Sequence, residues 1–555
     1  MTALKPFLSY FYKWEKTTPH EVYLRQPFGD TWEEYTWGEV GQMARRLATG
    51  LRSLGLPDGA HIGIVSKNCR EWIIADLAIM MGGYVSVPFF PTLRSGQIRE
   101  VLELGDVQAL FAGKLEDWEE MKQGVPEGMP IIAFPHYEGN SRVTEGEQWE
   151  DFLNRFEPLA ESPEPRLDDL FTIIFTSGTT GTPKGVMLTY GKPAELVRME
   201  KEEDLLKLRD GENSLISYLP LNHIAERALT EVLSIVYRCQ VSFVENLDTF
   251  AENLQAIQPT LFFAVPRIWT KFQLGILERM PQSRLNLLLR LPFLSGLVKR
   301  KIHHALGLNR ARILITAAAP MPDSMKDWYR RLGMNIQEIY GLTETCGGFT
   351  MTRAGEDTTG TVGRALKGSE MKIDPETGEV LSRGPWFMDG YYKNPEKTAE
   401  VFRDGWFHTG DSGRIDERGF LRLTGRVSEA FKTAKGKFVV PAPIEWKFAD
   451  NSDIEQICVT GLGLAQPIAL VVLSELGRAK ERAAIEQSLR ETLEAVNQKL
   501  ANYEKVATLV ITRELWSVEN GLLTPTLKVK RNELSNRYGL HFERWLTAVE
   551  TVVWE

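Results

Sequence analysis

Two hydrophobic patterns alternate along the first part of the chain. Apolar side chains recur every three or four positions over residues 37–54, which predicts an amphipathic helix, and Thr36 with Glu39 forms a capping-box pattern at its start. Short apolar runs bounded by glycine or proline at 61–66 and 84–90 predict buried strands, with a further apolar segment between them. This order of elements predicts a layered α/β domain built from βαβ units.

The same alternation returns over residues 170–339, and the pattern then changes. From about residue 371, short extended runs are separated by turn sequences at 374–378 and 416–419. We therefore expect βαβ subdomains followed by a β-rich subdomain over about 371–425.

The last part of the chain predicts a separate small domain. Strands are expected near 455–460 and 467–473, and a long charged helix over about 478–500. A chain of 555 residues is too long for one compact core. We place the boundary so that residues 1–425 form a large α/β domain and residues 426–555 a small α+β domain.

Charge and cysteine content argue against several classes of protein. Lys and Arg number 65 and Asp and Glu 74, and the resulting net charge of −9 argues against general binding of nucleic acid. The four cysteines have no CxxC pairing and no histidine at ligand spacing, which argues against a disulfide framework and a zinc site. The sequence starts without a signal-peptide pattern, and its least polar stretch, 77–90, is shorter than the about 20 residues of a membrane-spanning helix. We therefore expect a cytoplasmic protein.

One segment departs from the acidic balance of the chain. Residues 279–312 contain eight Lys and Arg residues interleaved with leucines and no acidic residue. Two interpretations stay open. The segment either lies against an anionic membrane, such as the inner face of the cell membrane, or is a packed helix with a solvated basic face.

The most informative segment is a loop rich in glycine and hydroxyl groups. An apolar run leads into Thr176-Ser177-Gly178-Thr179-Thr180-Gly181-Thr182-Pro183-Lys184-Gly185. Glycines let backbone N–H groups turn inward to form an anion-binding nest, while hydroxyl groups and a lysine add further contacts to phosphate oxygens. The spacing differs from the GxxxxGK[ST] of the P-loop. The loop therefore predicts a phosphate site of another kind.

This string resembles the signature of the adenylate-forming (AMP-binding) enzymes, a superfamily that includes acyl-CoA synthetases, luciferases and adenylation domains. The resemblance extends over roughly residues 36–531. It implies that the loop binds ATP through Thr176, Ser177, Gly178, Thr179, Thr180, Gly181 and Lys184, with Thr180 also close to Mg²⁺.

Further motifs follow in the order that this resemblance requires. Residues 218–227 are similar to the segment whose histidine, here His223, lies beside the acyl carboxylate. A neutral imidazole can orient a carboxylate oxygen without adding fixed charge. Residues 316–320 resemble the small-residue turn beside adenine, with Ala318 at its centre, although Ala317 stands where a glycine is expected.

The sequence YGLTET at 340–345 looks like the YGxTE motif of the superfamily. The resemblance implies that its aromatic ring stacks on adenine, that a threonine reaches the α-phosphate and that the glutamate holds Mg²⁺, a cation that prefers oxygen ligands. These residues are Tyr340 with Gly341, Thr343 and Glu344, respectively.

Two motifs nearer the C-terminus complete the resemblance. The sequence DGWFHTGD ends in Asp411, which would bind the ribose hydroxyls, with Arg426 as a second ribose contact at a hinge. The sequence TPTLKVKR is similar to the terminal motif whose lysine enters the adenylation site. Its spacing favours Lys528, with Lys530 as the alternative.

Two segments favour one branch of the superfamily. Residues 258–269 and 431–445 resemble those of long-chain fatty acyl-CoA synthetases. The region after the hinge also departs from the common pattern, with Ser428 where many members have Asp or Lys and with Ala434-Lys435 where a Gly-Gly pair is usual.

The resemblance implies a large layered domain, a small mobile domain and a two-step ligase. With ATP, Mg²⁺ and coenzyme A, the enzyme would convert a medium- or long-chain fatty acid to acyl-AMP and then to acyl-CoA, releasing pyrophosphate and AMP. The implied catalytic residues are Lys528, His223, Glu344 and Thr343. The alternatives are an acyl-acyl-carrier-protein synthetase or fatty acyl-AMP ligase, for whose acidic carrier the basic segment 279–312 would also suit, and a non-catalytic acyl- or nucleotide-binding protein.

Overall fold

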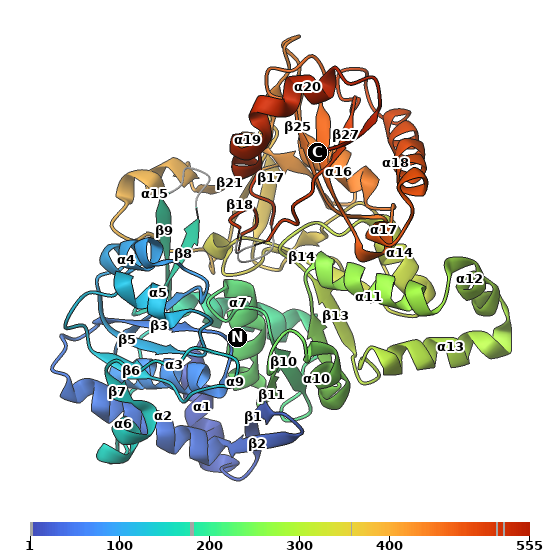
Figure 1. The fold of residues 1–555 in the computed structure, drawn as a ribbon. Helices are drawn as coiled ribbons and strands as arrows, with labels where there is room; N and C mark the ends of the chain where they lie inside the picture. The colour runs from blue at the N-terminus through green and yellow to red at the C-terminus, as the bar shows by residue number, and fades with distance from the viewer. Residues whose placement is uncertain (1–3, 178–181, 357, 518–519, 525–527) are drawn as a thin grey trace.

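The strands predicted at 61–66 and 84–90 lie side by side in the computed structural model, which describes residues 4–177, 182–356, 358–517, 520–524 and 528–555 (Figure 1). β3 (His61–Ser66) and β4 (Val85–Phe89) pair in parallel, with α3 (Arg70–Gly82) between them in the chain, so the βαβ prediction is confirmed. They belong to a mixed sheet in the order β19, β9, β8, β4, β3, β5, β6, β7. Its other strands are β5 (Val107–Gly113), β6 (Ile131–Ala133), β7 (Glu147–Gln148), β8 (Leu170–Ser177), β9 (Pro183–Thr189) and β19 (Gly390–Tyr391).

Helices cover both faces of this sheet. The predicted amphipathic helix is α2 (Trp37–Ser53), and its capping box is confirmed: the Glu39 amide donates to Thr36 Oγ1 at 3.2 Å, and the Thr36 amide donates to Glu39 Oε2 at 2.8 Å. α2 and α3 pack in one hydrophobic cluster with α1 (Phe7–Thr17) and α6 (Trp149–Arg155). α4 (Ser95–Leu104), α5 (Trp118–Met121) and the 3₁₀ turn η1 (Lys122–Gly124) lie over the other face.

Two further sheets lie beside the first and continue the predicted α/β pattern. One has the order β10, β11, β1, β2 and the other β12, β13, β14, β15, β16. Their strands are β1 (Val22–Phe28), β2 (Thr31–Thr36), β10 (Ser214–Ser217), β11 (Gln240–Phe243), β12 (Leu261–Phe263), β13 (Ile313–Thr316), β14 (Ile336–Tyr340), β15 (Thr350–Met351) and β16 (Arg364–Ala365). The accompanying helices are α7 (Gly191–Glu203), α8 (Ile224–Glu226), the π-helix η2 (Arg227–Val232), α9 (Leu233–Tyr237), α10 (Phe250–Ile257), α14 (Asp323–Arg331) and the 3₁₀ turn η3 (Thr343–Thr345).

Both hairpins predicted in the β-rich region are present. β17 (Glu370–Ile373) pairs with β18 (Glu379–Arg383), and β21 (Trp406–Ile415) pairs with β22 (Leu421–Arg426). Each turn is fixed by an aspartate side chain: Asp374 Oδ1 accepts two backbone N–H groups at 2.9 Å and Asp416 Oδ1 accepts two at 3.0 Å. The short strand β20 (Phe402–Arg403) follows α15 (Pro395–Val401) and extends this sheet.

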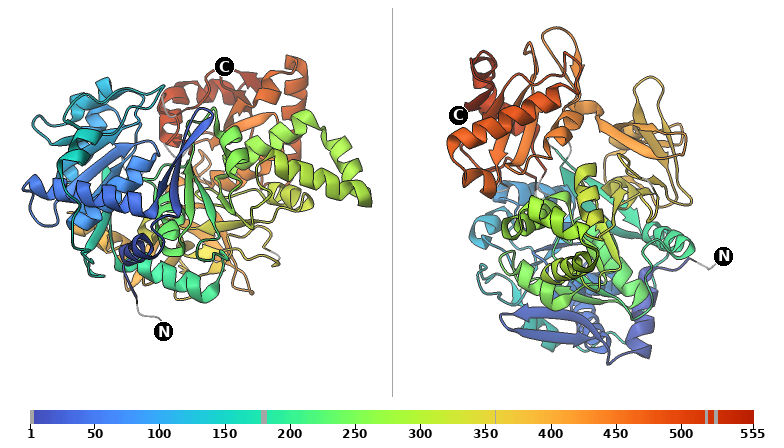
Figure 2. Two further views of the ribbon diagram at one scale, coloured as in Figure 1. Left: turned by 90° about the horizontal axis from the view of Figure 1, so that it is seen from below. Right: turned by 90° about the vertical axis from the view of Figure 1, so that its right-hand side faces the viewer.

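The C-terminal residues form a separate upper lobe, which Figures 1 and 2 show in orange and red. Its central sheet has the order β25 (Ile454–Thr460), β26 (Ile468–Leu473), β27 (Leu509–Ile511) and β28 (Val552–Trp554), so the strands predicted near 455–460 and 467–473 are confirmed. The lobe also contains β23 (Phe431–Lys432), β24 (Phe438–Val439), α16 (Pro441–Glu445), α17 (Glu475–Arg478), α18 (Arg482–Asn497), α19 (Arg531–Tyr538), α20 (Phe542–Leu546) and the 3₁₀ turns η4 (Val427–Glu429), η5 (Trp446–Phe448) and η6 (Gly539–His541).

The extent predicted for the long helix, about 478–500, is wrong, because the structure has two helices there, α17 and α18. The chain forms α17 first, because Ser474 Oγ accepts the Gly477 amide at 3.0 Å and so starts a separate short helix. A Cβ atom at Gly477 would lie 2.6 Å from the Asp453 carbonyl oxygen, so this turn is pressed against its neighbour. α18 begins only at Arg482.

The two lobes have separate hydrophobic cores. Two clusters contain only residues between Phe431 and Trp554, and the other three lie between Phe7 and Leu423. An ion pair at 2.7 Å between Arg267 and Glu455 of the upper lobe joins the two lobes. The boundary at 425/426 and the mobility of the small domain stay predictions.

The basic segment 279–312 does not form a single packed helix. After α11 (Pro266–Arg279), the helices α12 (Gln282–Arg290) and α13 (Pro292–Ala305) form an arm that projects to the right in Figure 1. In the described part of the chain, we find no helix with the length and apolar character needed to cross a bilayer.

Candidate active site

The predicted phosphate loop connects β8 to β9, which pair antiparallel with Thr176 opposite Lys184. Gly178, Thr179, Thr180 and Gly181 lie outside the described residues, as does the side chain of Ser177. Lys184 is half-buried, and its Nζ lies 5.6 Å from the centre of the Tyr391 ring. Loss of water lowers the pKa of Lys184, and the nearby charge of Lys397 lowers it further. The hairpin thus holds Lys184 at the base of the predicted phosphate loop.

The residues predicted to bind adenosine meet between two sheets. Tyr340 ends β14, and its hydroxyl donates to Asp411 Oδ2 at 2.7 Å. Arg426 Nε lies 3.1 Å from Asp411 Oδ1. Burial raises the pKa of Asp411, while Arg426 and the Tyr340 hydrogen bond oppose the rise. The fold therefore brings the three side chains into direct contact.

The segment after Tyr340 requires glycine for its close packing. A Cβ atom at Gly341 would lie 2.3 Å from Gly348 Cα, so only glycine fits there. The chain then makes the turn η3, which carries the buried Thr343 and the half-buried Glu344. This turn presents both predicted phosphate and metal residues beside β14.

The small-residue turn after β13 carries strain at one position. Ala318 has φ of +70°, a left-handed conformation that glycine adopts more easily. Ala317, where glycine was expected from the resemblance, has no such conformation and is buried. The structural demand for glycine therefore falls on Ala318.

His223 begins a short helix and is neutral at physiological pH. Its Nδ1 accepts the backbone N–H of Ala225 at 3.2 Å, so the neutral ring carries its proton on Nε2. Burial and the positive charge of Lys528 lower the pKa of His223 to about 4. The ring therefore offers one N–H donor and no charge.

Lys528 reaches the same region from the upper lobe. Its charge interacts with Arg426, Asp411 and Glu344 in the lower body, besides His223. The side chain remains accessible to solvent, but surrounding protein displaces part of its water and lowers its pKa, with the charge of Arg426 acting in the same direction. The preference for Lys528 over Lys530 stays a prediction.

An apolar cavity lies next to these residues. Its walls come from α7, from α8 with the π-helix η2, and from the turns that follow β13 and β14. Lining side chains include Leu196, Met199, Ala225, Ala228, Leu229, Val232 and Ala317, and Gly347 and Gly348 add backbone. A space of this kind suits a hydrocarbon chain.

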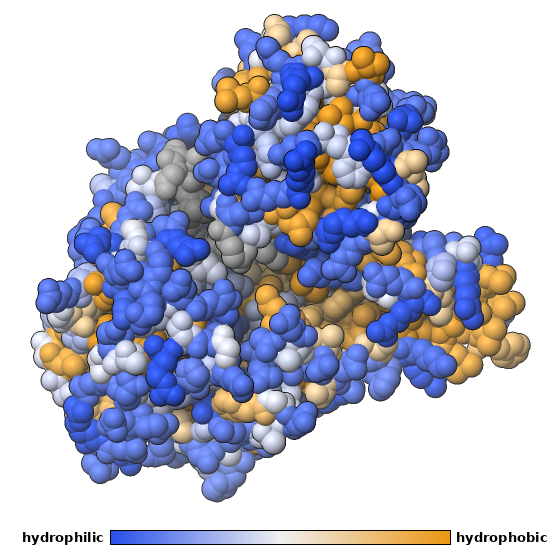
Figure 3. Space-filling view, in the orientation of Figure 1, coloured by the Kyte–Doolittle hydropathy of each residue, from blue (hydrophilic) through white to orange (hydrophobic). Residues whose placement is uncertain are grey.

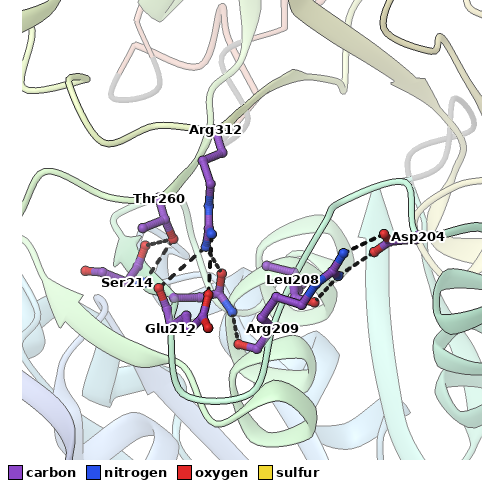
Figure 4. A network of polar contacts seen from close by, with 8 residues as sticks. Asp204, Leu208, Arg209, Glu212, Ser214, Thr260 and Arg312 are labelled. Carbon is purple, nitrogen blue, oxygen red and sulfur yellow. Dashed lines mark hydrogen bonds and ion pairs between the residues drawn. The ribbon is translucent and has the colours of Figure 1, made fainter.

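The loop between α7 and β10 adds Leu205 and Leu206 to the lining of the cavity. Glu200 Oε1 accepts the Leu206 amide at 2.9 Å, and burial raises the pKa of this carboxyl to about 7. Figure 4 shows how the loop is held: Arg209 pairs with Asp204 at 2.7 Å, and Arg312 lies 3.7 Å from Glu212. These contacts fix the wall of the cavity from outside.

A buried ionic cluster supports the cavity from the other side. Arg227, the first residue of η2, is fully buried and pairs with Asp76 at 2.6 Å and with Glu231 at 3.0 Å. Sequence reasoning singled out Arg227 only as part of a resemblance and did not find Asp76 or Glu231. Asp76 is 151 positions from Arg227 and leaves no spacing signal, whereas Glu231 follows Arg227 at the i,i+4 spacing of a helical ion pair.

Sequence reasoning also missed Tyr391. Its hydroxyl donates to Glu344 Oε1 at 2.7 Å, although the two residues are 47 positions apart. The only signal was a pair of tyrosines in an otherwise polar segment, and it does not identify which carboxylate they contact.

Two family profiles match this chain, one over most of the lower part and one over most of the upper lobe. A family profile described as AMP-binding enzyme matches residues 11–392, and one described as AMP-binding enzyme C-terminal domain matches residues 430–544. The long-chain-fatty-acid--CoA ligase FadD15 of Mycobacterium bovis is 30% identical over 95% of both chains. The peroxisomal long chain acyl-CoA synthetase 6 of Arabidopsis thaliana is 32% identical over 89% of this chain and 79% of its own.

Solved structures share the fold at lower identity. The anthranilate CoA ligase AuaEII in complex with anthranoyl-AMP has a TM-score of 0.80 at 19% identity, over 98% of this chain and 99% of its own. The adenylation domain of a carboxylate reductase from Mycobacterium chelonae has a TM-score of 0.81 at 21% identity, over 98% and 91%. The arrangement of a large α/β part and a small C-terminal part is thus common to these proteins.

Proposed function

This chain belongs to the AMP-binding enzyme family, and on that premise we propose that it uses ATP to join a medium- or long-chain fatty acid to coenzyme A. The observation that carries the proposal is the apolar cavity, whose lining includes Ala225, two residues after His223, and Ala317, next to Ala318. The names of the relatives at 30% and 32% identity support the same reaction.

The first step forms acyl-AMP. The carboxylate of the acid attacks the α-phosphorus of ATP, and the bond from that phosphorus to the bridging oxygen of pyrophosphate breaks. We assign adenosine to Tyr340, Gly341, Ala318, Asp411 and Arg426. His223 Nε2–H would orient the acid, while Thr343 and Lys184 contact the phosphates. Lys528 would stabilise the negative charge that builds up in the transition state.

The second step transfers the acyl group to a thiol. The sulfur of coenzyme A attacks the acyl carbonyl carbon, the thiol proton passes to solvent and AMP leaves. We propose that residues 426–555 rotate about 426–428 between the steps and withdraw Lys528, because one site then serves two reactions. The exposed Val427 at the end of β22 supports a pivot there.

We assign Mg²⁺ to Glu344, together with Thr180, which lies outside the described residues. Within the described ranges, no three His, Cys, Asp or Glu side chains gather into a ready metal site. Mg²⁺ is commonly held by one or two carboxylates together with substrate phosphates, so a single carboxylate beside phosphate-binding residues fits. When bound, the ion supplies charge neutralisation at the phosphates.

Product analysis tests the function directly. The protein should form acyl-CoA, AMP and pyrophosphate from ATP, Mg²⁺, coenzyme A and a mixture of acids, with the longer acids consumed first, as mass spectrometry would report. Ala228→Phe adds volume to the cavity and should lower kcat/KM for long acids about 10–200-fold relative to short ones. Acyl-AMP without acyl-CoA would instead indicate a carrier protein as acceptor, and ATP binding without any pyrophosphate would overturn the ligase proposal.

We further propose that the arm formed by α12 and α13 rests on an anionic membrane. Leu285 and Ile302 anchor it in a hydrophobic cluster, while Phe293 is 92% exposed. Apolar surface gathers along the arm in Figure 3. The other exposed apolar residues are Leu287, Leu291, Leu294 and Leu297, and the basic ones are Arg284, Arg290, Lys299, Arg300 and Lys301. Apolar side chains flanked by positive charge match an anionic lipid surface.

Vesicle co-sedimentation tests this contact. The protein should bind phosphatidylglycerol vesicles at low salt and release them as salt rises, because screening weakens attraction between charges. Replacing Phe293 and Leu297 with serine should remove most of the binding and leave acyl-CoA formation from dissolved acid unchanged. Leu540→Ser is the matched control, since Leu540 is 96% exposed on the other lobe. Equal loss in both variants, or no binding by the unmodified protein, would refute the contact.

A further inference from the structure

Tyr391 stands between two groups that the proposed reaction uses. Its hydroxyl donates to Glu344 Oε1 at 2.7 Å, and Lys184 Nζ lies 5.6 Å from the centre of its ring. The side chain is only 5% exposed. One phenol therefore contacts both the carboxylate assigned to the metal and the lysine assigned to phosphate.

The backbone of Tyr391 is fixed to the strand that carries Lys184. Tyr391 pairs with Val186 of β9, and its amide donates to Thr398 Oγ1 at 2.9 Å. The Met388 amide donates to the Glu344 carbonyl oxygen at 2.8 Å. The segment 388–391 thus ties the turn η3 to β9 through both main chain and side chain.

The hydrogen bond between Tyr391 and Glu344 has one possible direction. A carboxylate oxygen only accepts, so the Tyr391 hydroxyl donates to Glu344 Oε1 and favours one orientation of the carboxyl group.

Lys184 and Glu344 carry opposite charges that attract each other, yet within the described side chains each contacts Tyr391 and no ion pair joins the two. A direct pair would occupy both groups and take them away from substrate. The Tyr391 ring lies against Lys184 while its hydroxyl engages Glu344, so the opposite charges stay apart and remain available.

We propose that Tyr391 is a positioning residue for acyl-AMP formation, which sets the orientation of Glu344 and its separation from Lys184. This inference rests on the proposed function, in which Glu344 binds the cation and Lys184 a phosphate. Residues that orient a metal ligand typically change metal affinity 10–100-fold when they are replaced.

The test compares Tyr391→Phe with Tyr392→Phe. The neighbouring Tyr392 also donates to a carboxylate, Asp106 Oδ2 at 2.6 Å, so the control loses the same kind of bond elsewhere. We expect Tyr391→Phe to raise the Mg²⁺ concentration for half-maximal pyrophosphate exchange at least tenfold, and Tyr392→Phe to leave it unchanged. Mn²⁺ binding in the presence of a non-hydrolysable ATP analogue, followed by electron paramagnetic resonance, should weaken by the same factor.

A purely structural role predicts a different result. Tyr391→Phe would then lower the midpoint of thermal unfolding and the rate at every Mg²⁺ concentration, with Mn²⁺ binding unchanged, and the proposal would be overturned. If Tyr391→Phe does not fold, Thr398→Val removes the acceptor of the Tyr391 amide together with the hydrogen bond from Thr398 Oγ1 to the Asn394 carbonyl oxygen. It should shift Mn²⁺ binding in the same direction by a smaller factor, and no shift would equally overturn the proposal. A shift in Mn²⁺ binding without product from any acid would refute the proposed function and leave the role of Tyr391 intact.

Discussion

Lys528→Ala should lower the rate of acyl-AMP formation by about 10²–10³-fold, the usual loss when one group that stabilises transition-state charge is removed. The ammonium group comes from the upper lobe, and its charge interacts with Asp411, Glu344 and His223, which line the proposed site below. The rate is measured by exchange of labelled pyrophosphate into ATP at saturating acid.

The second half-reaction separates this role from general damage. Transfer of the acyl group from preformed acyl-AMP to coenzyme A should be nearly unchanged in Lys528→Ala, because the proposed rotation would withdraw the lysine from the site before that step. Lys530→Ala is the matched control, two residues away on the same segment, and should keep both rates. Equal loss of both half-reactions in Lys528→Ala, or a larger loss in Lys530→Ala, would contradict the assignment.

The elements that could be predicted depend on contacts close in sequence. The capping box of α2 needs only Thr36 and Glu39, and each hairpin turn needs one aspartate and its next few backbone amides. Such short-range bonds leave a direct trace in the order of residues. The helix predicted over about 478–500 is shorter in the structure, because the chain first forms the separate helix α17, whose Gly477 packs against Asp453, 24 positions earlier.

The residues of the site likewise fall into those that a local sequence pattern reveals and those that it does not. Motif residues such as His223, Tyr340 and Asp411 could be named because each lies in a recognisable string. The residues that hold these motif residues in place could not be named from the sequence. Tyr391 reaches Glu344 across 47 positions, and Arg227 reaches Asp76 across 151, so neither contact has a local pattern. The sequence also did not show which residues of the basic segment face solvent, because this depends on how α12 and α13 pack.

The buried cluster around Arg227 gives the largest expected effect on stability. Arg227→Ala would leave Asp76 without its counter-charge and Glu231 without its hydrogen-bond partner, in a site with no exposed side-chain surface. Removing one partner of a buried ion pair typically costs about 3–5 kcal/mol, because the remaining charge is uncompensated. Urea unfolding, followed by tryptophan fluorescence, should show this loss as a lower midpoint. The π-helix η2, which lines the apolar cavity, should lose its ordered structure at the same time. The activity of the enzyme should therefore fall more with long-chain acids than with short ones.

Glu231→Gln is the informative control, because its expected effect is small and depends on pH. Burial and the neighbouring Asp76 raise the pKa of Glu231 well above its usual value, against the opposing effect of Arg227. The raised pKa favours the protonated carboxyl, and glutamine mimics that form. A raised pKa in the folded state means that its contribution to stability is complete below the unfolded pKa of about 4.3 and decreases as pH rises above that value. The wild-type protein should therefore lose stability relative to Glu231→Gln between pH 5 and pH 8. If the wild-type protein instead gains stability relative to Glu231→Gln as the pH rises, Glu231 is ionised and Arg227 balances two charges.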